Sequence, residues 1–178
     1  MSIEYRLLVA HESERIKEIN PARFIKRAWR NIDGTMGWEE INWLDEGYPD
    51  GYDNHHAALK ATFDGAGLVV GAFDGERMVG FVSVNRDVFG SQFSHVLLDQ
   101  MFVDNNYQGC GIGKELFRLA VKTVKEWDVD KLYICAGSSE DTLGFYKSLG
   151  CIPAVEINQE LAEGDENDMQ LEYVLRTE

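Results

Sequence analysis

A glycine-rich run in the second half of the chain separates a strand-like segment from an amphipathic helix. Residues 97–103 before the run are largely apolar, and residues 113–127 after it repeat apolar side chains at helical spacing. Glycines at alternate positions, Gly109, Gly111 and Gly113, remove side chains where a helix start exposes unpaired N–H groups. An anion is favoured there, because backbone donors converge and the helix dipole is positive at this end. The run therefore predicts a phosphate-binding loop.

Two well-known phosphate-binding motifs do not match this sequence. A mononucleotide P-loop requires glycine where this chain has Gln108, and Ser or Thr where it has Glu115. A dinucleotide loop requires a further glycine at position 114 or 116, and it belongs after the first strand of a parallel βαβ unit. The chain has Lys114 and Leu116 at those positions.

The remaining pattern, Gln-x-x-Gly-x-Gly after an apolar strand, resembles the acyl-CoA loop of the GCN5-related N-acetyltransferase (GNAT) superfamily. The wider stretch LLDQMFVDNNYQGCGIGKELF is similar to that family's core, and FYKSLG resembles its second motif. The resemblance covers residues 67–153 and is weak in the N-terminal third. It implies a donor site in the matching part, whereas the acceptor site falls in the weak part.

Composition limits the classes of protein and partner. A chain of 178 residues with 44% hydrophobic and 27% charged residues predicts one globular domain over residues 1–178. No signal-like leader or bilayer-length apolar stretch is present in the sequence, so a cytoplasmic location is expected. The three cysteines are scattered, which indicates reduced thiols and no metal site. A net charge of −14 disfavours nucleic acid and anionic membranes. It favours cationic substrates, although surface acidity can also serve solubility alone.

Periodicity predicts a mixed α/β sandwich with a mostly antiparallel sheet of about seven strands flanked by helices. That order of elements is also the one the GNAT family shows. Asp74-Gly75 predicts a hairpin turn, and Gly144 inside a helix suggests close approach of a neighbour or of the cofactor. The strands are expected at residues 3–9, 67–73, 78–85, 94–103, 131–136, 151–157 and 169–176. Helices are expected at residues 12–19, 22–29, 55–63, 113–127 and 138–150, with residues 31–54 irregular.

The resemblance implies acetyl-CoA as cosubstrate, without a metal. Its diphosphate is expected on the loop residues Gln108, Gly109, Cys110, Gly111, Ile112, Gly113 and Lys114, and its pantetheine arm along Met101, Phe102, Val103 and Ser139. Ser139 stands where the family usually has asparagine, so its contact is either kept as a hydroxyl contact or lost. Tyr146 matches the tyrosine that protonates the departing thiolate, a role suited to a phenol. A glycine turn that binds nothing and a core tyrosine are the structural alternatives.

A catalytic base is expected on the strand before the loop. Strand alternation places His95, Leu97, Asp99, Met101 and Val103 on one face. Asp99 occupies a position where relatives carry a base or a group that holds water, and it needs burial or a water relay to act as a base. The alternatives are a carboxylate satisfied by its neighbours and His95 as the base, although lone histidines are usually structural.

The function expected from these observations is transfer of an acetyl group from acetyl-CoA to a primary amine, by direct attack in a ternary complex. The acceptor is a small molecule or peptide, and its pocket is expected in the aromatic and acidic segment 38–56, unless that segment is only a surface loop. A non-catalytic acyl-CoA-binding regulatory domain and a nucleotide-binding domain are the alternative functions. A homodimer is a reasonable default for a chain of this kind.

Overall fold

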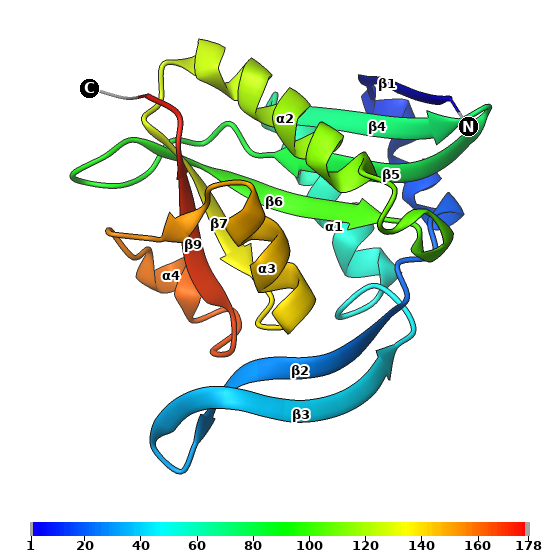
Figure 1. The fold of residues 1–178 in the computed structure, drawn as a ribbon. Helices are drawn as coiled ribbons and strands as arrows, with labels where there is room; N and C mark the ends of the chain where they lie inside the picture. Colours follow the sequence, from blue (N-terminus) through cyan, green and yellow to red (C-terminus); the bar gives the residue numbers. More distant parts are fainter. Residues whose placement is uncertain (1, 177–178) are drawn as a thin grey trace.

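The computed structural model describes residues 2–176, in which a seven-stranded sheet has the order β1-β4-β5-β6-β7-β9-β8 (Figure 1). Neighbouring strands pair antiparallel, except that β6 and β7 are parallel. This confirms the predicted mixed, mostly antiparallel sheet. The strands are β1 (Ile3–Leu7), β4 (Leu68–Asp74), β5 (Arg77–Val84), β6 (His95–Val103), β7 (Lys131–Ala136), β8 (Ile152–Pro153) and β9 (Met169–Val174).

Helices cover both faces of the sheet (Figure 1). Helices α2 (Ile112–Val124) and α3 (Glu140–Ser148) lie on one face, and α1 (Tyr52–Asp64) lies on the other with the 3₁₀ helix η1 (Ala10–Glu18). The central strands β4 and β5 are therefore buried almost continuously. The described chain also contains three short helices: η2 (Asn105–Tyr107), η3 (Lys125–Trp127) and α4 (Gln159–Ala162).

The predicted hairpin and loop-helix unit are present. Gly75 has a φ of +58° in the turn between β4 and β5, as the Asp-Gly signal requires. Helix α2 packs an apolar stripe on the sheet, and its buried members are Ile112, Leu116, Phe117, Ala120, Val121 and Val124.

Strand β6 carries a bulge that the sequence pattern did not reveal. Gln100 lies opposite Ser83 and Leu98 lies opposite Val84, so Asp99 is an extra residue between these pairs. An extra residue shifts the alternation by one position. The prediction that residues 95, 97, 99, 101 and 103 share one face is therefore wrong. The core cluster beneath α2 and α3 instead receives Val96, Leu98, Met101 and Val103.

The two parallel strands diverge shortly after they begin to pair. Their register runs from His95 opposite Lys131 to Leu98 opposite Ile134, although β6 continues to Val103. The second half of β6 therefore has an edge not paired to β7, with backbone groups open to a ligand. A cleft opens at this divergence.

A two-stranded arm extends from the main sheet and is formed by β2 (Arg23–Ile32) and β3 (Thr35–Asp45) (Figure 1). The expected helix at 22–29 and the irregular segment at 31–54 are both wrong here. The apolar residues of β2 recur at helical spacing, which explains why a helix was predicted for this strand. The turn between the strands, Asp33-Gly34, has positive φ at both positions, so the same hairpin signal was present.

The C-terminal part differs from the prediction in the extent of one strand. Helix α3 begins at the expected serine cap, and β8 pairs antiparallel with β9. However, β8 contains only Ile152 and Pro153, where a strand was expected to run to residue 157. The chain turns away because the Glu156 carboxylate accepts hydrogen bonds from the backbone N–H groups of residues 91–93.

Candidate active site

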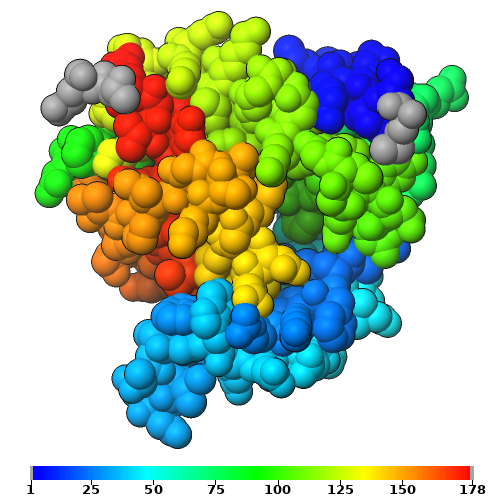
Figure 2. Space-filling view, viewed as in Figure 1, coloured from blue at the N-terminus to red at the C-terminus, as the bar shows by residue number. Residues whose placement is uncertain are grey.

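A cleft of about 620 Å³ opens where β6 leaves β7, and Figure 2 shows the surface hollowed between α3 and the glycine loop. Its walls come from the end of β6, the glycine loop, α3 and the β2–β3 arm. The size is typical of a small-molecule or cofactor site. Most of the predicted site residues line it: Met101, Phe102, Val103, Gln108, Gly109, Gly111, Ile112, Gly113, Lys114, Ser139 and Tyr146.

The glycine loop presents bare backbone to this cleft. Gly109 and Gly111 have φ values of +77° and +85°, which other residues rarely adopt. Gly111 is the N-cap of α2 and no side chain caps the helix, so its first amides are free to bind an anion. A methyl group at Gly113 would lie 3.3 Å from the Phe145 ring, so this glycine permits α2 to pack closely on α3.

Two residues of the predicted loop behave differently from the glycines. Cys110 is exposed and does not line the cleft. The Gln108 side chain donates to the carbonyl oxygens of Ala22 and Val103 at 3.4 and 3.3 Å, which ties the loop to β6 and to the segment entering the arm. These contacts give Gln108 a structural function at the cleft, and its contact with a phosphate remains a prediction.

Tyr146 lies on α3 at the opposite wall from the loop and is 7% exposed. Its ring packs edge-on against Phe117 and Phe145, with centroids 6.4 and 5.2 Å apart. Burial raises the pKa of the Tyr146 hydroxyl above its ordinary value. The phenol therefore keeps its proton at neutral pH and can give it to a strongly basic group.

Ser139 lines the cleft as the N-cap of α3. Its hydroxyl donates to Thr142 Oγ1 at 2.8 Å and accepts from the Thr142 backbone N–H at 3.3 Å. The serine proton is thus used inside the helix cap, and only oxygen lone pairs remain for a ligand. A contact between Ser139 and a cofactor remains a prediction.

Asp99 lies in the bulge of β6 and is not part of the cleft wall. Its Oδ2 accepts from Gln100 Nε2 at 3.4 Å, and the Gln100 Oε1 atom is 2.8 Å from Nδ1 of His55. Burial raises the pKa of Asp99, while the hydrogen bond from Gln100 and the nearby His55 oppose that rise. The carboxylate is therefore more basic than an exposed one. Sequence reasoning missed Gln100 and His55, because no motif marks a pair brought together from α1 and β6.

His95 does not join the cleft residues. It is 1% exposed and is surrounded by the rings of Phe89, Phe93 and Tyr133, beside a separate cavity of about 290 Å³. Its Nε2 atom lies 3.6 Å from Glu172 Oε2. The structure therefore places it in the packed interior, which is the structural alternative for a lone histidine.

The acceptor segment 38–56 reaches the cleft only in part. Asp45 lines it, together with Gly47 and Pro49. Tyr48 packs in the core and donates to the Ile16 carbonyl oxygen at 2.8 Å, while Trp43 is 61% exposed on the arm. Four cleft residues that sequence reasoning missed lie at the entry to the arm, where a helix was expected: Pro21, Arg23, Phe24 and Ile25. The others are Tyr107, Asp141, Thr142 and Phe145.

Among residues 2–176, no group of three or more His, Cys, Asp and Glu side chains could hold a metal ion. In the same part of the chain, no helix combines the length and apolar character needed to cross a bilayer.

The model of the acetyltransferase (GNAT) family matches residues 35–151. A search of curated protein sequences found no match. Among solved structures, a nourseothricin acetyltransferase is similar at a TM-score of 0.73 with 15% identity, over 99% of this chain and 100% of that chain. A putative streptothricin acetyltransferase from Bacillus anthracis, in complex with acetyl coenzyme A, gives 0.71 with 14% identity over 100% of both chains. The PaiA N-acetyltransferase from Thermoplasma acidophilum, in complex with coenzyme A, gives 0.62 with 18% identity, over 98% of this chain and 99% of that one. At these identities the structural likeness establishes the fold.

Proposed function

The chain belongs to the acetyltransferase (GNAT) family, and on that basis we propose that it transfers an acetyl group from acetyl-CoA to a primary amine. The observation that supports this most strongly is the arrangement of the cleft. It brings the bare amides of the glycine loop, the unpaired edge of β6 and the Tyr146 phenol around one space. The amine attacks the thioester directly in a ternary complex.

The donor is acetyl-CoA. Its diphosphate binds the amides that begin α2, where the helix dipole and Lys114 both favour negative charge. Its pantetheine arm follows the edge of β6 at residues 101–103, which the divergence from β7 leaves open. A backbone N–H of that edge polarises the thioester carbonyl.

Tyr146 acts as the general acid. When the amine nitrogen bonds to the carbonyl carbon, the C–S bond breaks and its electron pair goes to sulfur. Tyr146 then donates its proton to that sulfur, so that CoA leaves as a neutral thiol. Its position on the cleft wall and its retained proton support this function.

Asp99 accepts the proton of the attacking amine through water. Its carboxylate lies outside the cleft wall, so a water molecule carries the proton from the amine to Asp99. The rise in its pKa, caused by burial, makes it a better base than an exposed carboxylate.

The cysteines support direct transfer over an acetylated enzyme. Burial raises the pKa of Cys135 to about 11 and that of Cys151 to about 12, so both remain poorly nucleophilic thiols at neutral pH. Cys110 is exposed and lies outside the cleft wall.

The acceptor is a cationic amine of low molecular weight or a basic peptide. The net charge of −14 attracts cations, and the cleft wall includes two carboxylates, that of Asp45, which pairs with Arg23, and that of Asp141. Antibiotic amines of the kind named for the two similar acetyltransferase structures are the first compounds to assay.

Amine-dependent release of CoA tests this function. A panel of nourseothricin and streptothricin, aminoglycosides, polyamines, amino acids and basic peptides is incubated with acetyl-CoA and the protein, and free thiol is measured. At least one amine is expected to give release that depends on both substrates. An acyl-CoA-binding regulatory domain would instead be stabilised by acetyl-CoA yet release no thiol with any amine.

Thermal shifts test the nucleotide alternative with the same protein. Acetyl-CoA at 100 times its Kd is expected to stabilise the fold by about 2.7 kcal/mol. Stabilisation by NAD or ATP equal to that by acetyl-CoA would contradict the proposed donor.

A further inference from the structure

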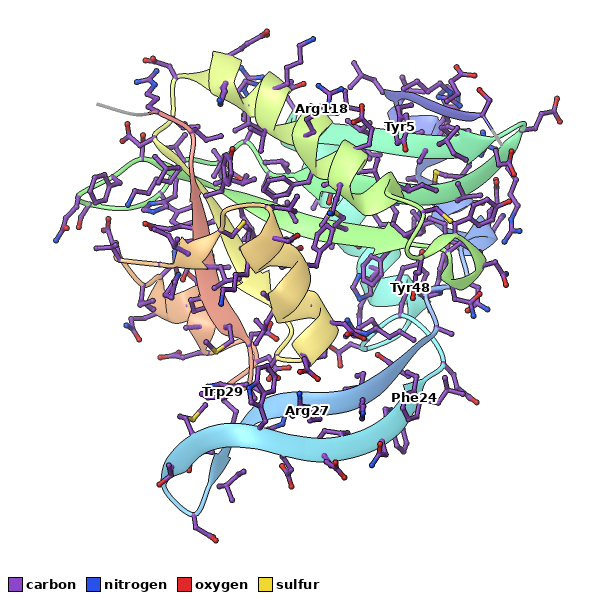
Figure 3. All side chains as sticks on the ribbon, in the orientation of Figure 1. Tyr5, Phe24, Arg27, Trp29, Tyr48 and Arg118 are labelled. Atoms are coloured by element: carbon purple, nitrogen blue, oxygen red, sulfur yellow. The ribbon has the colours of Figure 1, made fainter. Side chains whose placement is uncertain are left out.

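The β2–β3 arm is fastened to the beginning of α3 by polar groups of β2. The backbone N–H of Trp29 donates to the Ser138 carbonyl oxygen at 2.8 Å, and Arg30 hydrogen-bonds the Ser138 side chain. Arg27 forms an ion pair with Glu140. Figure 3 labels Arg27 and Trp29 on the arm below α3. The arm is thus a fixed wall of the cleft.

Arg23 makes a contact of a different kind, because its side chain lies in the cleft wall. Its Nη1 atom donates to Thr142 Oγ1 at 2.9 Å, and its Nε atom is 3.7 Å from Asp45 Oδ2. A methyl group built on Gly137 would lie 3.7 Å from Nη2, so the strand end before α3 also borders the guanidinium. The guanidinium is therefore held by one hydrogen bond to Thr142 and an ion pair with Asp45.

This position is one helical turn from the proposed general acid. Thr142 and Tyr146 are four residues apart on α3, so they share a face of the helix, and both line the cleft. The Arg23 guanidinium, held by Thr142, therefore lies on the tyrosine side of the cleft. The other cationic residue of the cleft wall, Lys114, stands at the start of α2 on the phosphate side.

We propose that Arg23 is a further catalytic residue of the acetyl transfer, and that its guanidinium stabilises the negative charge which develops beside Tyr146 when the C–S bond breaks. This inference rests on the function proposed above. The electron pair of the C–S bond first gives a thiolate, and proton transfer from Tyr146 then gives the CoA thiol and a phenolate. The phenolate recovers a proton from solvent. The excess proton on the attacking nitrogen goes to the base, which leaves a neutral amide.

A fixed guanidinium suits both stages of this charge development. Arginine stays protonated throughout the pH range in which proteins fold, so it supplies a permanent positive charge without a proton transfer of its own. Charge stabilisation of this kind requires a donor that is held in place before the reaction, and the hydrogen bond to Thr142 and the ion pair with Asp45 supply that. The charge of Arg23 also lowers the pKa of Tyr146, against the larger rise that burial causes.

Steady-state kinetics of three variants test the proposal. Arg23→Ala is expected to lower kcat by about 100-fold, with the KM for acetyl-CoA changed by less than about threefold, because the group acts in the transition state. Arg23→Lys keeps the positive charge but replaces the planar guanidinium by an ammonium group, and it is expected to retain intermediate activity. Guanidinium ion added at millimolar concentration is expected to restore part of the activity of Arg23→Ala and none of that of Tyr146→Phe.

Arg27→Ala is the matched control. Arg27 lies on the same strand and also ties the arm to α3, but it is outside the cleft wall and its side chain is 40% exposed. Its kcat is expected to stay within about twofold of the wild type, because exposed ion pairs contribute little. An equal loss of kcat in both variants would show that Arg23 only fastens the arm, and would overturn the proposal.

Three other outcomes separate this proposal from the function on which it depends. A wild-type protein that releases CoA with an amine, together with an Arg23→Ala variant of unchanged kcat, would overturn the catalytic function of Arg23 alone. A raised KM at unchanged kcat would also overturn it, by reducing Arg23 to a binding group. A wild-type protein that releases no CoA with any amine would overturn both.

Discussion

Replacing Tyr146 by phenylalanine removes one hydroxyl from the cleft and keeps the ring that packs between Phe117 and Phe145. We expect kcat to fall by about 100- to 10,000-fold, because a positioned general acid contributes about that factor. A loss of about 1,000-fold corresponds to about 4 kcal/mol of transition-state stabilisation. The free energy of unfolding should change by less than about 1 kcal/mol, because at most one hydrogen bond is lost.

Thiol release at saturating acetyl-CoA and amine measures the first quantity, and urea unfolding measures the second. Tyr173→Phe is the control, since its ring also contacts Phe117, at 5.3 Å, but is not part of the cleft wall. The control should keep the kcat of the wild type. Equal kcat values for Tyr146→Phe and the wild type would refute the reasoning, because Tyr146 would then serve only packing.

The remaining predictions concern the loop, a helix, the half-buried carboxyl group of Asp168 and the buried one of Glu172. Gly111→Ala should cost about 1–2 kcal/mol of stability at its φ of +85° and weaken acetyl-CoA binding by calorimetry, whereas unchanged binding would contradict the phosphate loop. Gly144→Ala should stabilise the protein by about 1 kcal/mol in urea, because no atom lies within 4 Å of the added methyl group; a loss of stability would contradict this. Burial raises the pKa of Asp168 from 3.8 to about 6, so the folded state binds the proton more tightly and stability falls as pH rises between these values. Asp168→Asn should flatten that decline in unfolding measured across this range, and an unchanged slope would contradict the assignment. Glu172→Gln should cost about 3 kcal/mol in urea unfolding, because it leaves the buried Lys131 ammonium, 2.7 Å away, without its counter-charge; a loss below about 1 kcal/mol would contradict this.

The sequence revealed the elements that depend on local backbone chemistry. The glycine loop was predictable because positive φ and an uncapped helix start demand glycine at Gly109 and Gly111. The Asp-Gly hairpin, the serine cap of α3 and the apolar stripe of α2 were predictable for similar reasons, since each is set by neighbours along the chain. The close neighbour expected at Gly144 is an exception, because no residue of the described chain approaches this glycine closely.

The rest depended on tertiary pairing that no short pattern encodes. The apolar spacing of β2 fits a helix as well as a twisted strand, so the arm and its cleft residue Arg23 were missed. The bulge at Asp99 moved every later side chain of β6 to the other face. Glu156 ends its strand early, because its carboxylate binds a loop far away in the sequence. In each case the deciding partner lies many residues away.

Identification of the product tests the central claim most directly. The protein is incubated with acetyl-CoA carrying a deuterated acetyl group and with the amine that gives the fastest CoA release, and the products are analysed by mass spectrometry. The account predicts the amine with one deuterated acetyl group in an amide bond, in equal amount to the free CoA, and no acetyl group left on the protein. CoA release with an unmodified amine, or a protein that itself carries the label on Cys110, would contradict direct transfer.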